Sequence, residues 1–77
     1  MSTAYFSHLF KVIMGISVTD FINRIRISKA IQLLNESEYN ITEICFLVGF
    51  NNLSHFIKIF KRSVGMTPSE FKKNERK

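Results

Sequence analysis

The chain of 77 residues has a single cysteine, and this excludes two kinds of structural cross-link. Cys45 has no partner for an intramolecular disulfide and no second cysteine for a metal site. It lies in an apolar run at residues 44–48, so we expect a small buried core residue there. At this length only roughly 60% of the unfolded surface is buried, so the core must be compact and helical or completed by a partner.

Long apolar segments are missing as well. No stretch approaches the roughly 20 apolar residues that span a bilayer, and the amino end lacks the apolar run of a signal peptide. Acidic residues are few, since 6 Asp and Glu against 11 Lys and Arg give a net charge of +5. This surplus indicates a polyanionic partner, and we favour nucleic acid over an anionic membrane surface. We therefore predict a cytoplasmic protein with no membrane partner.

Apolar residues make up 45% of the chain and include eight Phe, a composition that predicts a folded domain. Their spacing predicts an all-α fold without strands, with helices at residues 3–14, 18–35, 41–48, 53–64 and 68–74. Ser17, Asn40, Asn52 and Thr67 are the expected N-caps. The longest helix is expected to be amphipathic along its whole length, through Val18, Phe21, Ile22, Ile25, Ala30, Leu33 and Leu34.

An internal repeat relates residues 5–21 to residues 55–71 without a gap. The identical pairs are Phe6/Phe56, Phe10/Phe60, Lys11/Lys61, Gly15/Gly65 and Phe21/Phe71. In the second copy, residues 40–50 precede the repeat and contain a predicted helix, whose counterpart in the first copy would lie before residue 1. Either the first copy never had that helix or the chain begins inside a unit, and we favour the second explanation.

The predicted helices at residues 41–48 and 53–64 are separated only by Gly49, Phe50, Asn51 and Asn52, a spacing typical of a helix-turn-helix. The helical wheel of residues 53–64 places Leu53, Phe56, Phe60 and Val64 on one side, Ser54, His55, Lys58, Lys61 and Arg62 on the other, and Ile57 and Ile59 at the borders. A basic face on the second helix of such a pair indicates DNA binding in the major groove, with a merely solvated face as the alternative.

In the first copy the outward positions are Ala4, Ser7, His8 and Lys11, and the inward ones are Phe6, Leu9, Phe10 and Ile13. A metal-ligand or general-base role for His8 or His55 has little support, because neither belongs to a cluster of suitable partners. No nucleophile–base pair or phosphate-binding glycine loop is evident. We therefore expect no enzyme activity, no cofactor and no metal.

These features occur in a specific order, which continues through the rest of the chain. The motif comprises Ser2, Tyr5-Phe6-Ser7-His8-Leu9-Phe10-Lys11, Gly15 with Ser17, Arg26-Ile27, Ala30, Leu33-Leu34, Ile41-Thr42-Glu43-Ile44, Val48-Gly49-Phe50, Ser54-His55-Phe56, Phe60-Lys61, Gly65-Met66-Thr67-Pro68 and Phe71-Lys72. With this pattern the sequence resembles the AraC-type (arabinose-operon regulator) family of bacterial transcription factors over about residues 2–73.

The resemblance implies homeodomain-like helix-turn-helix units joined by a long linker helix. The expected parts are a recognition helix of an incomplete first unit at 1–16, the linker helix at 17–36, a complete second unit at 40–65, and a C-terminal helix with a basic tail at 67–77. A linker of about 26 Å would separate two reading helices by a distance comparable to one DNA turn of about 34 Å.

For DNA contacts, the resemblance implies base-reading positions at Leu53, Ser54, His55 and Lys58, and at Thr3, Ala4, Ser7 and His8 in the first unit. Lys11, Lys61, Arg62 and the backbone N–H groups near Asn52 are expected to contact phosphates. Family members commonly carry Tyr at the position of His55, Ala at that of Cys45 and Ser at that of Ile57, so the base preference stays open.

The predicted function is therefore sequence-specific binding of double-stranded DNA, as part of a bacterial transcription regulator acting at the nucleoid. RNA polymerase is left open as a second partner of a full-length protein. The alternative is a helical fragment that forms a homo-oligomer through the apolar side of its first helix and binds DNA weakly.

Overall fold

The computed structural model describes residues 3–75, which form five helices and no strand. These are α1 (Thr3–Met14), α2 (Val18–Glu36), α3 (Ile41–Leu47), α4 (Leu53–Val64) and α5 (Pro68–Glu75). The all-α prediction is confirmed, and every helix end lies within one residue of its expected position. Ser2 of the family motif and residues 76–77 of the expected basic tail lie outside the described residues.

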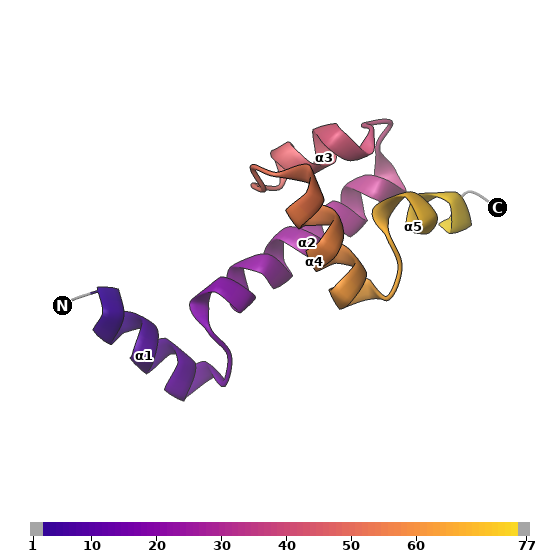
Figure 1. Cartoon of the computed structure of the whole chain (residues 1–77). Helices are drawn as coiled ribbons and strands as arrows, with labels where there is room; N and C mark the ends of the chain where they lie inside the picture. Colours follow the sequence, from indigo (N-terminus) through magenta and orange to yellow (C-terminus); the bar gives the residue numbers. More distant parts are fainter. Residues whose placement is uncertain (1–2, 76–77) are drawn as a thin grey trace.

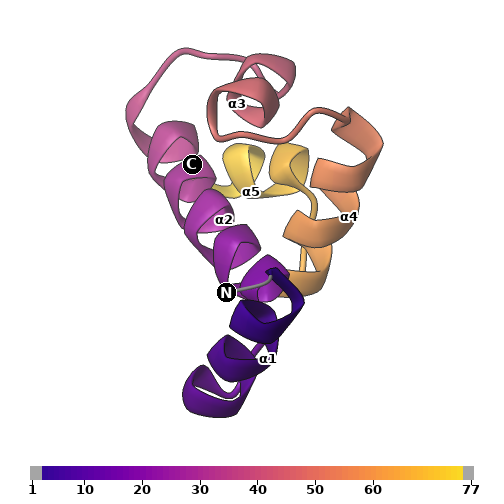
Figure 2. The same cartoon turned by 90° about the vertical axis from the view of Figure 1, so that its left-hand side faces the viewer.

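The long helix α2 organises the molecule (Figure 1). Helix α4 packs against α3 and α5, and all three pack on α2, whereas α1 extends beyond the first turn of α2 and away from them. Seen from the N-terminal side, α1 projects from one end of α2 while the other three helices lie toward its opposite end (Figure 2). The result is an elongated shape with extents of 48 × 20 × 20 Å.

Side-chain caps fix where the helices begin, as the sequence predicts. The hydroxyl of Ser17 accepts a hydrogen bond from the backbone N–H of Asp20 at 3.0 Å, and Asn40 forms a reciprocal capping box with Glu43. Thr67 and Glu70 form a second capping box, with distances of 2.9 and 3.2 Å. The hydrogen bond from the Thr67 backbone N–H to the Glu70 carboxylate lowers the pKa of Glu70, because it favours the charged form.

The core lies between the C-terminal half of α2 and helices α3 and α4. Its buried members are Ile27, Ala30, Leu34, Ile44, Cys45, Val48, Phe50, Phe56, Ile59 and Phe60. Cys45 is fully buried as expected, and burial raises the pKa of its thiol. Ile59 belongs to this core rather than to a border of α4, because α4 packs against α2, α3 and α5 and its buried arc is wide.

The expectation that α2 is amphipathic along its whole length is wrong for its first half. Ile22 and Ile25 are 39% and 43% exposed, whereas Ile27, which was not assigned to the predicted apolar face of this helix, is buried. The physical reason is that the helices after α2 cover chiefly its C-terminal half, so apolar residues near its start have no comparable cover in the described chain.

The two repeat copies share local structure but differ in burial. Each copy ends its helix at a glycine with positive φ, 80° at Gly15 and 95° at Gly65, and each glycine N–H donates to a lysine carbonyl at 2.8 Å. Phe56 and Phe60 of the second copy are completely buried, whereas Phe6, the counterpart of Phe56, is 51% exposed. Helix α1 buries no residue, although Phe10 contacts Phe21 edge-on at 5.3 Å.

The turn between α3 and α4 is held against the linker helix by an arginine. Gly49 has a φ of 109°, a conformation that favours glycine. A Cβ at this position would lie 2.9 Å from Nε of Arg26, whose guanidinium carbon is 5.4 Å from the centre of the Phe50 ring. This cation–π contact ties α2 to the turn from which α4 begins.

Phe60 and Phe10 are equivalent residues of the repeat that differ in burial, so their substitutions form a matched pair. We expect Phe60→Ala to lower the free energy of unfolding by about 3–5 kcal/mol, because it leaves a cavity in a fully buried position. Phe10→Ala is expected to cost less, about 1 kcal/mol, since its side chain is only half-buried. Urea unfolding followed by far-ultraviolet circular dichroism measures both, and equal losses would contradict the difference in packing.

The Arg26 contact predicts different costs at two glycines that share a positive φ. Gly65→Ala meets no atom within 4 Å, so it is expected to cost about 1–2 kcal/mol through backbone strain alone. Gly49→Ala must also displace Arg26 from Phe50, which adds about 0.5–1 kcal/mol. A double-mutant cycle with Arg26→Ala tests this, because the extra cost disappears in that background. An extra cost that persists without Arg26 would refute this explanation.

Candidate nucleic-acid interface

The outer face of α4 carries the polar and basic residues that the sequence analysis selected. Ser54, His55, Lys58, Lys61 and Arg62 are all exposed, as is the cap residue Asn52. The opposite side of α4 is anchored by Phe56 and Phe60, which have no exposed surface. Rotation of α4 about its axis is therefore fixed by its core side, and the basic face is held toward solvent.

Two contacts position the first turn of α4. The side chain of Asn52 accepts a hydrogen bond from the backbone N–H of His55 at 2.9 Å. The His55 ring lies edge-on to Phe50, with ring centres 5.8 Å apart, and Phe50 is in turn buried against Phe56. His55 is thus an exposed side chain whose backbone and ring both have supports. Leu53 is half-buried and packs against the core, so it differs in burial from the neighbouring Ser54 and His55, which are exposed.

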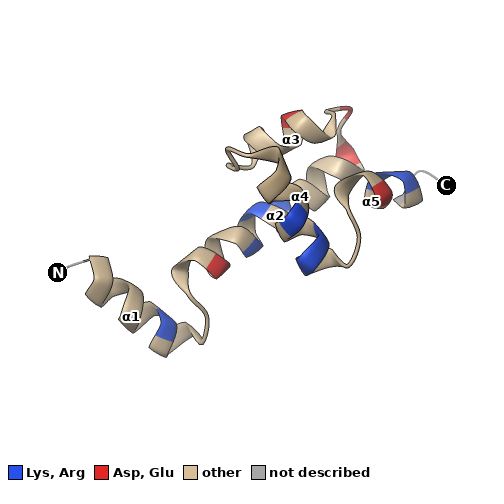
Figure 3. Ribbon diagram, in the orientation of Figure 1, with Lys and Arg blue, Asp and Glu red and all other residues tan. Residues whose placement is uncertain are grey.

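Positive charge gathers on the side of the molecule formed by α4 and the adjacent part of α2. Figure 3 shows Lys and Arg on these two segments, with others on α1 and α5. Asp and Glu appear on α3, on α5, at the connection between α2 and α3, and in the first turn of α2, where Asp20 lies. Lys61 and Arg62 lie in the last turn of α4, where a positive charge is also favourable to the helix dipole. The arrangement is suited to an anionic partner of extended shape.

Helix α1 presents a second, less basic face. Its predicted site residues Thr3, Ala4, Ser7, His8 and Lys11 are all exposed. The repeat pairs Tyr5 with His55 and Ser7 with the half-buried Ile57. Tyr5, which is 54% exposed, therefore occupies an outward position that the sequence analysis did not select, although the register of the repeat contains the signal for it.

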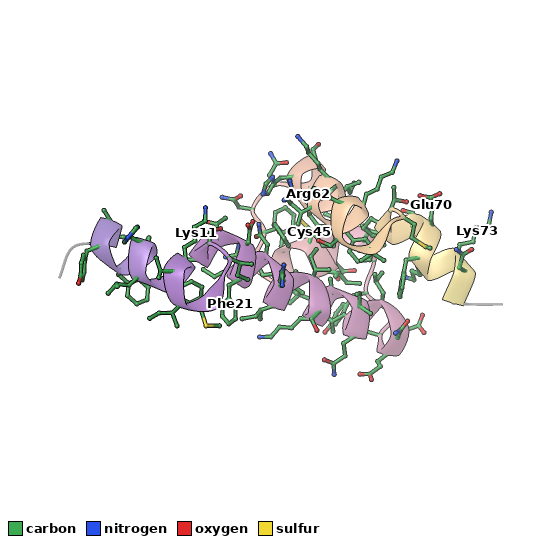
Figure 4. The ribbon with its side chains drawn as sticks, turned by 90° about the horizontal axis from the view of Figure 1, so that it is seen from below. Lys11, Phe21, Cys45, Arg62, Glu70 and Lys73 are labelled. Atoms are coloured by element: carbon green, nitrogen blue, oxygen red, sulfur yellow. The ribbon has the colours of Figure 1, made fainter. Side chains whose placement is uncertain are left out.

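The predicted site residues of α1 and α4 lie at a distance from one another along the linker helix. In Figure 4, the side chains of Lys11 on α1 and Arg62 on α4 both point away from the same side of the ribbon. The 19 residues of α2 between them correspond to a length of about 28 Å. The predicted site residues thus form two groups held apart by a single helix.

The described residues offer neither a metal site nor a membrane-spanning helix. Residues 3–75 contain no group of three or more His, Cys, Asp or Glu side chains placed to hold a metal ion. Within the same range, no helix combines the length and apolar character needed to cross a membrane.

Comparison with known proteins extends these observations. A family model described as a helix-turn-helix domain matches residues 1–74. The regulatory protein PocR of Salmonella typhimurium is 36% identical over 72 residues, which cover 94% of this chain and 24% of that protein. The chain therefore spans about a quarter of the length of this curated relative.

Solved structures agree with this match. The C-terminal domain of the two-component response regulator yesN from Fusobacterium nucleatum superposes with a TM-score of 0.88 at 35% identity, covering 94% of this chain and 70% of that one. A transcriptional regulator from Chromobacterium violaceum, described as containing an AraC-type DNA-binding domain, gives 0.83 at 25% identity and covers 97% and 67%. The chain belongs to the AraC-type helix-turn-helix family of bacterial DNA-binding transcription regulators.

Proposed function

We propose that the chain binds duplex DNA in a sequence-specific manner, with α4 in one major groove and α1 in the adjacent one. The observation that carries this proposal is the exposed basic face of α4, which is fixed in orientation by the fully buried Phe56 and Phe60. A helix in this position of a helix-turn-helix is the element that enters the major groove.

Base contacts are assigned to the exposed side chains near the start of each recognition helix. On α4 these are Ser54, His55 and Lys58, with the half-buried Leu53 limited to an apolar contact at the edge. On α1 they are Thr3, Ala4, Ser7 and His8, to which the repeat adds Tyr5. Lys11, Lys61, Arg62 and the backbone N–H groups near Asn52 are assigned to phosphates, which position the protein without reading bases.

The linker helix sets the distance between the two reading helices. Its length of about 28 Å is comparable to the roughly 34 Å of one DNA turn, so one chain can engage two successive major-groove segments on one side of a duplex. In this proposal α1 is the recognition helix of the first unit and residues 40–65 form the second. The protein then acts at the bacterial nucleoid, and RNA polymerase is a proposed partner of the whole regulator.

Self-association is the second candidate. Its support is the exposed apolar side of α1, where Ile13 is 76% and Phe6 51% exposed. It explains neither the basic face of α4 nor the family to which the chain belongs. Sedimentation equilibrium decides it, because a monomer mass that does not change with concentration excludes an oligomer.

The two assigned classes of contact predict different effects of substitution. For a duplex selected by the chain from a random library, Lys58→Ala is expected to reduce the preference over a random duplex by about 1–3 kcal/mol. Lys61→Ala is expected to weaken both duplexes alike and to reduce the slope of log affinity against log salt by about 0.9. Fluorescence anisotropy across a salt series measures both quantities.

Lys73→Ala on α5 is the matched control, since it removes an exposed positive charge outside the proposed interface. Its effect on preference and on salt slope should be smaller than that of either α4 variant. The proposed role of α4 would be abandoned if Lys58→Ala kept the full preference of the original chain.

A further inference from the structure

Two arginines from different helices line one polar hollow of the molecule. Arg24 comes from the first half of α2 and Arg62 from the last turn of α4, and Asp20 and Ser63 complete the lining. The hollow has a volume of about 440 Å³ and opens to solvent. Neither arginine was needed to explain the core, since both side chains are exposed.

The charges in this hollow are suited to an anion. Among residues 3–75, no ion pair engages the guanidinium of Arg24 or of Arg62, so their donors remain available. The single carboxylate of Asp20, one turn before Arg24, leaves a net charge of +1. Guanidinium groups match phosphate oxygens in geometry, and the Ser63 hydroxyl adds a neutral donor. Phosphate is the ligand chemistry that this set of donors fits best.

The hollow also lies where a duplex would pass. Arg62 follows His55 by seven residues and Lys58 by four, so it shares their face of α4 two turns and one turn further along. Through Arg24 the hollow reaches the first half of the linker helix, which is the end of α2 that follows α1. Lys11 and Arg62 point to the same side of the molecule (Figure 4). A duplex held by α1 and α4 would then pass the part of α2 that carries Arg24.

We propose that Arg24 and Arg62 together bind a backbone phosphate of the DNA segment between the two major-groove contacts. The linker helix is then a DNA-contacting element and not only a spacer. This inference rests on the proposed function, because it needs a duplex that spans α1 and α4. It adds Arg24, which neither the motif nor the repeat identified.

The first test is Arg24→Gln, compared with Lys29→Gln on the same helix. Lys29 is exposed and lies five residues on, about 140° around the helix, so its variant removes the same charge from a different side. We expect Arg24→Gln to reduce the salt slope by up to about 0.9, the full value for one phosphate, because Arg62 can keep part of the contact. The loss of affinity relative to the original chain then shrinks by up to roughly threefold between about 50 and 200 mM salt. The preference for the selected duplex over a random one should stay unchanged, because a phosphate carries no sequence information.

A second variant is expected to change DNA affinity in the opposite direction. Asp20→Asn keeps the backbone N–H that donates to Ser17 and removes the carboxylate, so affinity for both duplexes should rise. A scan of the selected duplex with neutral methylphosphonates then locates the contact. One substituted phosphate between the two major-groove segments should weaken the original chain more than it weakens Arg24→Gln, in which only Arg62 still contacts that phosphate.

The outcomes separate this inference from the proposed function. If the original chain selects a duplex but Arg24→Gln and Lys29→Gln have equal salt slopes, the phosphate site is refuted while the proposed function stands. If the original chain shows no preference for any duplex, the proposed function fails and the inference fails with it. Circular dichroism of each variant confirms that the helices are retained, so a loss of binding is not a loss of fold.

Discussion

The burial of Phe56 and Phe60 is the constraint on which the rest of the structure depends. These two rings fill the space between α4, α3 and the linker helix, and they determine which side of α4 is left for solvent. Phe50 extends the same aromatic cluster into the turn, where it contacts both His55 and Arg26. The orientation of an exposed histidine is thus connected to the core through two aromatic side chains.

The local features of this fold were predictable from sequence because they depend on neighbouring residues. The N-caps at Ser17, Asn40 and Thr67 follow from short-range hydrogen bonding, and the basic face of α4 follows from the helical period. The exposure of Ile22 and Ile25 was not predictable, since a helical pattern alone does not show which part of a long helix other helices cover. The burial of Ile59 depends in the same way on three-dimensional packing.

The features of the candidate site that the sequence did not predict are contacts between helices that are distant in sequence. Nothing in the motif indicates that Arg26 reaches the Phe50 ring, or that Arg24 and Arg62 line one hollow. Each pair joins the linker helix to the second unit across more than twenty residues. The outward position of Tyr5, by contrast, was predictable from the repeat, because the alignment of the two copies pairs this residue with His55.

Because α2 is one uninterrupted helix, its length determines both the distance and the rotation between α1 and α4. Each residue in an α-helix adds a rotation of about 100° and an advance of about 1.5 Å. In the proposed complex, a single inserted residue in α2 would therefore rotate α1 by about 100° relative to α4, toward another side of the duplex, while changing the distance between them by only about 1.5 Å. In the proposed complex, substitutions on the outer faces of α1 and α4 would change the bases that are read, whereas the length of α2 would be constrained by the helical period of DNA.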